Sequence, residues 1–333
     1  MIKLLSIIGL FAGLILITGL IAWQGAMDIL SLLQASGWPL LFVALAWSPS
    51  VFIGTTAWRY LFKAGPDPRY YDMFMALWMG RAINTLLPVA SIGGEVVKAR
   101  MLIQWGYDKA QSTASVVVDK TIQVLALIIW GVIGVGLLVN YSVDLALAKY
   151  ALIGFSSLGG AVALFLMAQK SGLFHATTNT LHKATGFDFF DNLKQGARDI
   201  DEAVKQCYGR RGRFFASLTW RMMMLILQSA EVWAAAYVLG FPISVMEAVF
   251  LKSLTSTISD VAFIIPNAYG LQEGAYIVFG AVIGLPADLA LAISLATRLR
   301  ELIFDVPGLI LWQRAEGKKF FSHQKPPEGQ PPS

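Results

Sequence analysis

Charged residues and metal ligands are scarce in this chain. Only 14% of its 333 residues are charged and 56% are hydrophobic, whereas soluble domains carry roughly 25% charged residues. The single cysteine, Cys207, excludes an intramolecular disulfide and a thiolate metal cluster. The three histidines all lie in polar segments, so we expect no metal site and no cofactor. The composition indicates a polytopic membrane protein, and the net charge of +5 reflects membrane orientation rather than nucleic-acid binding.

Long apolar runs fill most of the sequence. The N-terminal run exceeds the roughly 7–15 apolar residues of a cleavable signal, so we expect it to be an uncleaved first helix. Six stretches reach the length of about 20 residues that a spanning helix needs. They are 3–23, 38–62, 113–139, 150–168, 214–239 and 287–312. Two more stretches, 73–103 and 242–283, are apolar but interrupted by proline, glycine and charge.

The placement of lysine and arginine predicts the orientation. Loop 24–37 has none and loop 140–149 has only Lys149, whereas 59–72, 98–109, 169–213 and the tail are basic. Cytoplasmic loops carry the excess of cations. All basic segments can be cytoplasmic only if each interrupted stretch enters and leaves on one side. We therefore predict an all-α membrane fold with six spanning helices, two re-entrant helical hairpins and cytoplasmic termini. A surface loop between two shorter helices is the alternative for each hairpin.

Residues 1–315 are predicted to form a single transmembrane domain with a cytoplasmic connection at 169–213. Apolar residues recur there at helical spacing, namely Leu193, Ala197, Ile200, Val204 and Cys207. This pattern favours an amphipathic helix on the membrane surface, and a solvated linker helix stays open. The composition of the tail, 316–333, predicts disorder.

The two interrupted stretches share a pattern. The first reads LLPVASIGGEVV and the second IIPNAYGLQEGA, so a glutamate follows the proline by seven positions in each (Pro88 to Glu95, Pro266 to Glu273). The flanking helices have the same order, and the predicted orientation makes units 38–139 and 214–312 antiparallel. Inverted repeats with broken helices are a recurrent transporter plan. The free N–H groups at such breaks suit an anionic headgroup.

Ionisable residues lie inside the apolar stretches, where each costs on the order of 2.5–3.5 kcal/mol. They include Arg81, Asp119, Lys120, Glu231, Asp260, Arg298, Glu301 and Asp305. Each could instead be a structural ion pair between helices, as Arg298 and Glu301 could be. We favour a functional role for Glu95 and Glu273, because both occupy the same place in the repeat. No catalytic motif is present, so an enzyme is the weaker interpretation.

The first hairpin carries the pattern N-x-L-x-P followed by Gly-Glu and a cation, and ASVVVDKTIQVLAL opens the next helix. With these motifs the chain, over roughly 5–315, resembles the flippase-type transmembrane region of lysylphosphatidylglycerol synthases and standalone membrane proteins that share it. The family's second hairpin resembles P-G-G-x-G-x-R-E. Here Asn267 and Ala268 replace the glycines and Gln272 replaces the arginine, which implies a less anionic cargo.

The sequence is most similar to the branch associated with hopanoid biosynthesis. The resemblance implies a transporter or flippase of the bacterial inner membrane, for hopanoids or related lipids. The alternative is a membrane enzyme or scaffold in hopanoid or lipid-linked biosynthesis. Expected partners are membrane lipids (hopanoid or phospholipid) and lipid-biosynthesis enzymes, and a homo-oligomer stays open. The candidate transport residues are Arg81, Asn84, Pro88, Gly94, Glu95, Lys98, Asp119, Lys120, Asp260, Pro266, Gly270, Gln272, Glu273, Arg298 and Glu301.

Overall fold

The computed structural model describes residues 37–62, 68–87, 93–141, 189–262 and 266–322, and the isolated positions 153, 160, 164 and 167. Side chains are not described for 189–197, 266 and 317–322. The described elements are all helices: α3 (Leu40–Trp47), α4 (Pro49–Arg59), α5 (Tyr70–Leu86), α6 (Gly93–Gln104), α7 (Lys109–Tyr141), α10 (Phe189–Gly209), α11 (Arg211–Val238), α12 (Val245–Val261), the short turn η1 (Pro266–Ala268), α13 (Leu271–Val282) and α14 (Ala287–Ser322). The predicted helix 3–23, most of 150–168, and Pro88 lie outside the described residues.

Four of the predicted spanning stretches are helical. Stretch 38–62 forms α3 and α4, which divide at Pro49, a residue that has no N–H to continue the first helix. Stretches 113–139, 214–239 and 287–312 correspond to α7, α11 and α14. Within the described residues, Leu40–Arg59 and Lys109–Tyr141 are long and apolar enough to cross a membrane. The all-helical fold is confirmed, and the six spans and the re-entrant placement of the hairpins stay predictions.

Both interrupted stretches form a helix, a break and a second helix. In the first, α5 and α6 cross so closely that a Cβ on Gly94 would lie 1.9 Å from the carbonyl oxygen of Gly80. The Gly94 N–H also donates to Oδ1 of Asn84 at 2.7 Å. In the second, Ser244 caps α12 through a reciprocal pair of hydrogen bonds with Glu247. The chain then turns through η1 into α13.

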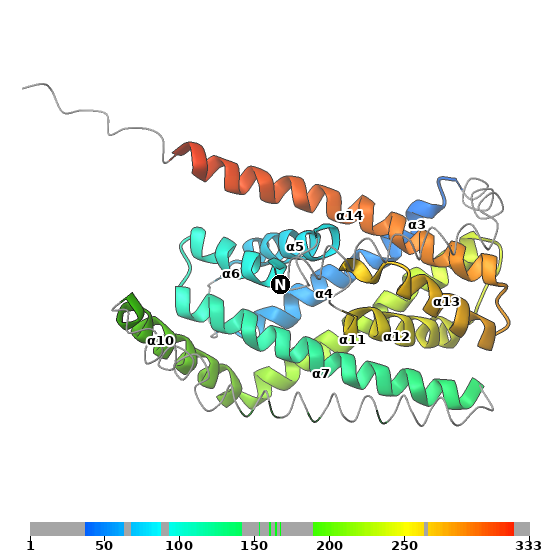
Figure 1. The fold of residues 1–333 in the computed structure, drawn as a ribbon, viewed down its shortest axis with the longest axis horizontal. Coiled ribbons are helices and arrows are strands. Elements are labelled where there is room, and N and C mark those ends of the chain that lie inside the picture. The colour runs from blue at the N-terminus through cyan, green and yellow to red at the C-terminus, as the bar shows by residue number, and fades with distance from the viewer. Residues whose placement is uncertain are drawn as a thin grey trace, which may run out of the picture.

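The two hairpins contact α7 and α14 in opposite order along the chain. The first hairpin contacts the early part of α7 and the later part of α14, and the second hairpin does the reverse. On α7, the early residue Asp119 contacts α6, and the later Gly134 faces Ser253 of α12. On α14, the early residue Arg298 contacts α13, and the later Asp305 contacts α5. Figure 1 shows the result, with α5 and α6 toward one end of the bundle and α12 and α13 toward the other. Two units related by inversion would show this pattern of contacts.

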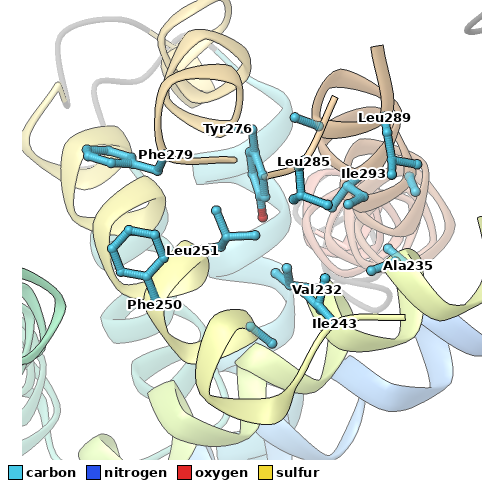
Figure 2. Packing of buried hydrophobic residues seen from close by; sticks show 14 of the residues in the cluster. Val232, Ala235, Ile243, Phe250, Leu251, Tyr276, Phe279, Leu285, Leu289 and Ile293 are labelled. Atoms are coloured by element: carbon cyan, nitrogen blue, oxygen red, sulfur yellow. The ribbon is translucent and has the colours of Figure 1, made fainter. Parts of the chain in front are cut away.

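Two apolar cores lie at the two ends, and a polar layer separates them. One core joins α3, the end of α7, α11, α12, α13 and the start of α14, with Phe250, Leu251 and Tyr276 among its fully buried side chains (Figure 2). The other surrounds Trp58 and Met101 and joins α4, α5, α6, the start of α7 and α10. Along α7, α11 and α14 the polar positions fall between the two cores. A smaller apolar cluster of Ala126, Trp130 and Leu225 packs between α7 and α11 beside these polar positions.

The helix predicted in the cytoplasmic connection is α10. Among its described side chains, Val204 and Cys207 are buried in the core around Trp58, and Ile200 packs against that core. The Cys207 thiol donates to the carbonyl oxygen of Leu61 at 3.3 Å. This part of the apolar stripe is covered by the protein itself and is not free to face a membrane. The C-terminal helix also continues beyond residue 315, because α14 ends at Ser322.

Candidate functional site

A cavity of about 460 Å³ lies in the polar layer between the two cores. Its lining comes from both hairpins and from α3, α4, α7, α11 and α14. The cations that line it are Arg81, Lys98, Lys120, Arg221, Lys252 and Arg300. The carboxylates that line it are Glu95, Asp260 and Glu301. The surface of the cavity thus carries more cations than carboxylates, and further carboxylates lie directly behind it.

Asp119 is the carboxylate behind the first hairpin. It is fully buried, and it accepts from Lys98 Nζ at 2.8 Å, from Gln123 Nε2 at 2.9 Å and from the guanidinium of Arg221. Lys98 also pairs with Glu95 at 2.6 Å. Three helices, α6, α7 and α11, meet at this one side chain. Because a buried charge is tolerated only when it is paired and hydrogen-bonded, these residues fix the mutual position of the three helices.

Glu231 has the corresponding role at the other side of the cavity. It is fully buried on α11, where it pairs with Lys252 of α12 at 2.5 Å and with Arg300 of α14 at 2.7 Å. Helix α11 therefore contributes a cation, Arg221, to one cluster and a carboxylate to the other. The two clusters are linked through the backbone of a single helix that runs past the cavity.

Glu273 caps α13 and does not line the cavity. Its Oε2 accepts the N–H of Gly270 at 2.7 Å, and its Oε1 accepts from Arg298 at 2.9 Å. Arg298 also pairs with Glu301 at 3.2 Å. This is the ion pair that the sequence offered as an alternative to a functional role. Glu95 and Glu273 are each the third residue of their helix, as the spacing suggested, but only Glu95 reaches the cavity.

Trp47 holds two of the cavity cations. The guanidinium carbons of Arg81 and Arg300 lie 4.1 Å and 4.4 Å from the centroid of its ring. Trp47 itself is only 2% exposed. A cation over an indole face is stabilised by about 0.5–2 kcal/mol. Arg81 also pairs with Asp305 at 3.0 Å. The Nη1 of Arg300 is buried without a hydrogen-bond partner among the described residues.

The cavity brings together eight of the predicted residues: Arg81, Asn84, Glu95, Lys98, Lys120, Asp260, Gln272 and Glu301. Asp119, Glu273 and Arg298 lie outside its lining, and Gly94, Pro266 and Gly270 shape the backbone of the hairpins. The sequence reasoning missed Arg221, Lys252 and Arg300. The signal was present, because each is a cation inside a predicted apolar stretch. Within the described residues, no three histidine, cysteine or acidic side chains form a group that could hold a metal ion.

Two cavity residues are accessible and weakly held. The side chain of Lys120 is 41% exposed and has Glu95 as its ion-pair partner at 3.7 Å. Asp260 is exposed toward the cavity, and no described residue forms a hydrogen bond or an ion pair with it. These side chains can change partner without leaving a buried charge unpaired.

The turn of the second hairpin contains two departures from the family pattern, and its geometry explains the one at Asn267. Asn267 has a φ of 50° and Ala268 a φ of 48°, a left-handed conformation that favours glycine. The Asn267 amide donates to Glu301 at 2.6 Å. Asparagine tolerates this conformation, so its side chain links the turn to α14. Ala268 forms no such link and adopts the conformation at a cost of roughly 1–2 kcal/mol.

Residues 10–307 match the family described as the lysylphosphatidylglycerol synthase TM region. The chain therefore belongs to this family of membrane proteins. It is 22% identical over 299 residues to a UPF0104 membrane protein of Methanocaldococcus jannaschii, a match that covers 84% of this chain and 87% of that protein. No solved structure matches the chain significantly. The family resemblance predicted from the hairpin motifs is thus confirmed.

Proposed function

We propose that this protein is a lipid transporter that receives the polar headgroup of a membrane lipid in its central cavity. The observation that carries the proposal is a charged cavity in the middle of the helical bundle, in a chain that belongs to a family of membrane proteins. Ionisable side chains at membrane depth are costly and mark a substrate path by default. The hydrocarbon part of the lipid would stay in apolar surroundings while the headgroup exchanges water for these side chains.

The chemistry of the lining supports a headgroup that carries a phosphate. Six cations face three carboxylates around the cavity, and Arg300 offers a buried N–H without a partner. Guanidinium and ammonium groups bind phosphate oxygens by charge-assisted hydrogen bonds. The missing arginine at Gln272 suggested a less anionic cargo, but Arg300 and Lys252 supply the positive charge from neighbouring helices. A hopanoid cargo is the narrower expectation, and it rests on the resemblance to that branch.

Lys120 is the residue to test, because its replacement leaves Glu95 paired with Lys98 and so leaves no buried charge without a partner. The purified protein in vesicles would be assayed for movement of a fluorescent phosphatidylglycerol between leaflets, with a neutral lipid and a hopanoid as parallel cargoes. A charge-assisted hydrogen bond contributes about 1.5–3 kcal/mol. The Lys120→Gln variant loses this contact, so it should move phosphatidylglycerol between leaflets roughly tenfold more slowly, or slower still.

The matched control is Lys109→Gln, which removes the same charge from an exposed position on the same helix. It should move lipid at the wild-type rate. If wild-type protein moves none of the three lipids, the transport proposal fails, and an accessory role in lipid synthesis becomes the better account. Faster movement of the hopanoid than of phosphatidylglycerol would assign the cargo to the branch predicted from the sequence.

The membrane arrangement belongs to the same proposal. The distribution of lysine and arginine predicts that both termini lie in the cytoplasm. Reporter fusions at the C-terminus and at loop 140–149 would test it. A cytoplasmic reporter signal from loop 140–149 would contradict the inverted arrangement of the two units.

A further inference from the structure

A second cavity of about 540 Å³ lies in the seam between α6 and α7. Within the described residues its lining comes from these two helices alone. The side chains that face it are mainly aliphatic: Val96, Ala99 and Ile103 from α6, and Val116 and Val117 from α7. On α6 they are spaced three and four residues apart, so they lie on one face of that helix. On α7, Val116 and Val117 are adjacent, and Thr113 lines the groove one turn before Val116. We call this cavity the α6–α7 groove.

The groove meets the charged cavity at Glu95, which lines both. Lys98 and Lys120, the ion-pair partners of Glu95, line only the charged cavity. At the other end, Arg100 and Gln104 are held by Glu316 of α14, with distances of 2.8 Å and 3.4 Å. A helical rise of about 1.5 Å per residue puts roughly 13 Å between Glu95 and Gln104. The groove is thus an apolar channel that begins where the phosphate-binding lining ends.

The polarity of the two cavities matches the two parts of a lipid. If the headgroup of a lipid lies among the cavity cations, its hydrocarbon chain must leave the charged layer close to the headgroup. Apolar surface placed beside charged side chains contributes no favourable free energy. The groove supplies an apolar path at that point, and Val96 beside it is 60% exposed. A hydrocarbon gains little by moving from the bilayer into an apolar groove. The groove therefore selects the seam through which the lipid reaches the cavity and adds little affinity.

We propose that the α6–α7 groove binds one acyl chain of a glycerophospholipid whose phosphate lies beside Lys120 in the charged cavity. This inference rests on the proposed function. The volume of the groove lies within the roughly 300–1,000 Å³ of small-ligand sites. The surplus of cations at its inner end favours an acyl chain attached to a phosphate over an uncharged polycyclic lipid.

Photolabelling tests the occupant directly. The full-length protein in phosphatidylcholine vesicles would receive a trace of phosphatidylglycerol that carries a diazirine in one acyl chain. After irradiation, peptides labelled at Val96, Ala99 or Val117 are expected, and unlabelled phosphatidylglycerol should suppress that labelling at least fivefold. Val278, an exposed valine on α13, is the control for ordinary contact with the bilayer and should show no such competition.

Two results of labelling or cross-linking would overturn the inference. One is that unlabelled phosphatidylglycerol suppresses labelling of the groove no more than it suppresses labelling at Val278. The other is a photo-cross-link from a benzoylphenylalanine at position 96 to residues 3–23 of the same chain, since that segment would then occupy the groove.

A bulky side chain in the groove separates this inference from the proposed function. Val117→Trp should abolish competed labelling at Val96 and slow phosphatidylglycerol movement about tenfold, while Val278→Trp leaves both unchanged. If the wild type moves lipid and Val117→Trp moves it equally fast, the groove inference fails alone. If the wild type moves no lipid but the competed labelling is present, the transport proposal fails and the binding site stands. Wild-type labelling decides the matter if the variant does not fold.

Discussion

Replacement of Asp119 should destabilise the protein more than any other single change of charge at the first hairpin. Its carboxylate is fully buried, and the side chains of its partners Lys98 and Arg221 are 5% and 7% exposed. Asp119→Asn leaves the two cations facing a neutral amide. Removing one partner of a buried ion pair costs about 3–5 kcal/mol. At about 2–4 °C per kcal/mol, a loss of 4 kcal/mol lowers the unfolding midpoint by roughly 8–16 °C.

The single cysteine provides the assay. Cys207 is 5% exposed, and burial raises the pKa of its thiol. The thiolate is the reactive form, so a fluorogenic maleimide should react slowly with the folded protein and fast after unfolding. The increase in fluorescence with temperature in detergent micelles then gives the midpoint for each variant.

Two variants make the result specific. The apolar replacement Lys98→Met, Asp119→Leu, Arg221→Met removes all three charges together, so its midpoint should lie well above that of Asp119→Asn. Asp260→Asn removes a carboxylate that no described residue pairs with, so its unfolding midpoint should equal that of the wild type. A wild-type midpoint for Asp119→Asn would refute the reasoning, because the cluster would then contribute nothing to holding α6, α7 and α11 together.

Three further predictions use the same thermal assay. Gly94→Ala should lower the midpoint by more than 5 °C or prevent folding, because its Cβ would overlap the Gly80 carbonyl, whereas Gly136→Ala has open space and should match or slightly exceed the wild type. Ala268→Gly should retain or raise the midpoint, since relief of roughly 1–2 kcal/mol of backbone strain offsets the loss of one buried methyl group; a fall of more than a few degrees would contradict this. Glu316→Gln should change the midpoint by less than about 4 °C, because Arg100, its partner, is 57% exposed in its side chain and such pairs contribute about 0–1 kcal/mol.

The sequence predicted the local features of the site and not the pairing between distant helices. The shared sequence pattern correctly set Glu95 and Glu273 at equivalent positions, the third residue of α6 and of α13, because the start of a helix is decided by nearby residues. It could not tell that Glu273 would be bound by Arg298 and Gly270 and so lie outside the cavity. The pairing of Asp119 with Arg221 joins residues 102 positions apart.

Such long-range pairings depend on how helices pack, and composition and periodicity carry no information on that. Arg221 and Lys252 could still have been proposed, since both are cations in apolar stretches. The split of the apolar core into two ends also required the structure, because each long helix contributes to both cores and to the polar layer between them.

The crossing of Gly80 and Gly94 limits how this protein can change shape. Main-chain atoms of α5 and α6 touch there without room for a methyl group, so neither helix can slide along the other. The first hairpin must then shift as one rigid piece, and any rearrangement falls on seams where side chains meet. A cross-link that ties α5 to α6 should therefore leave the movement of lipid unchanged.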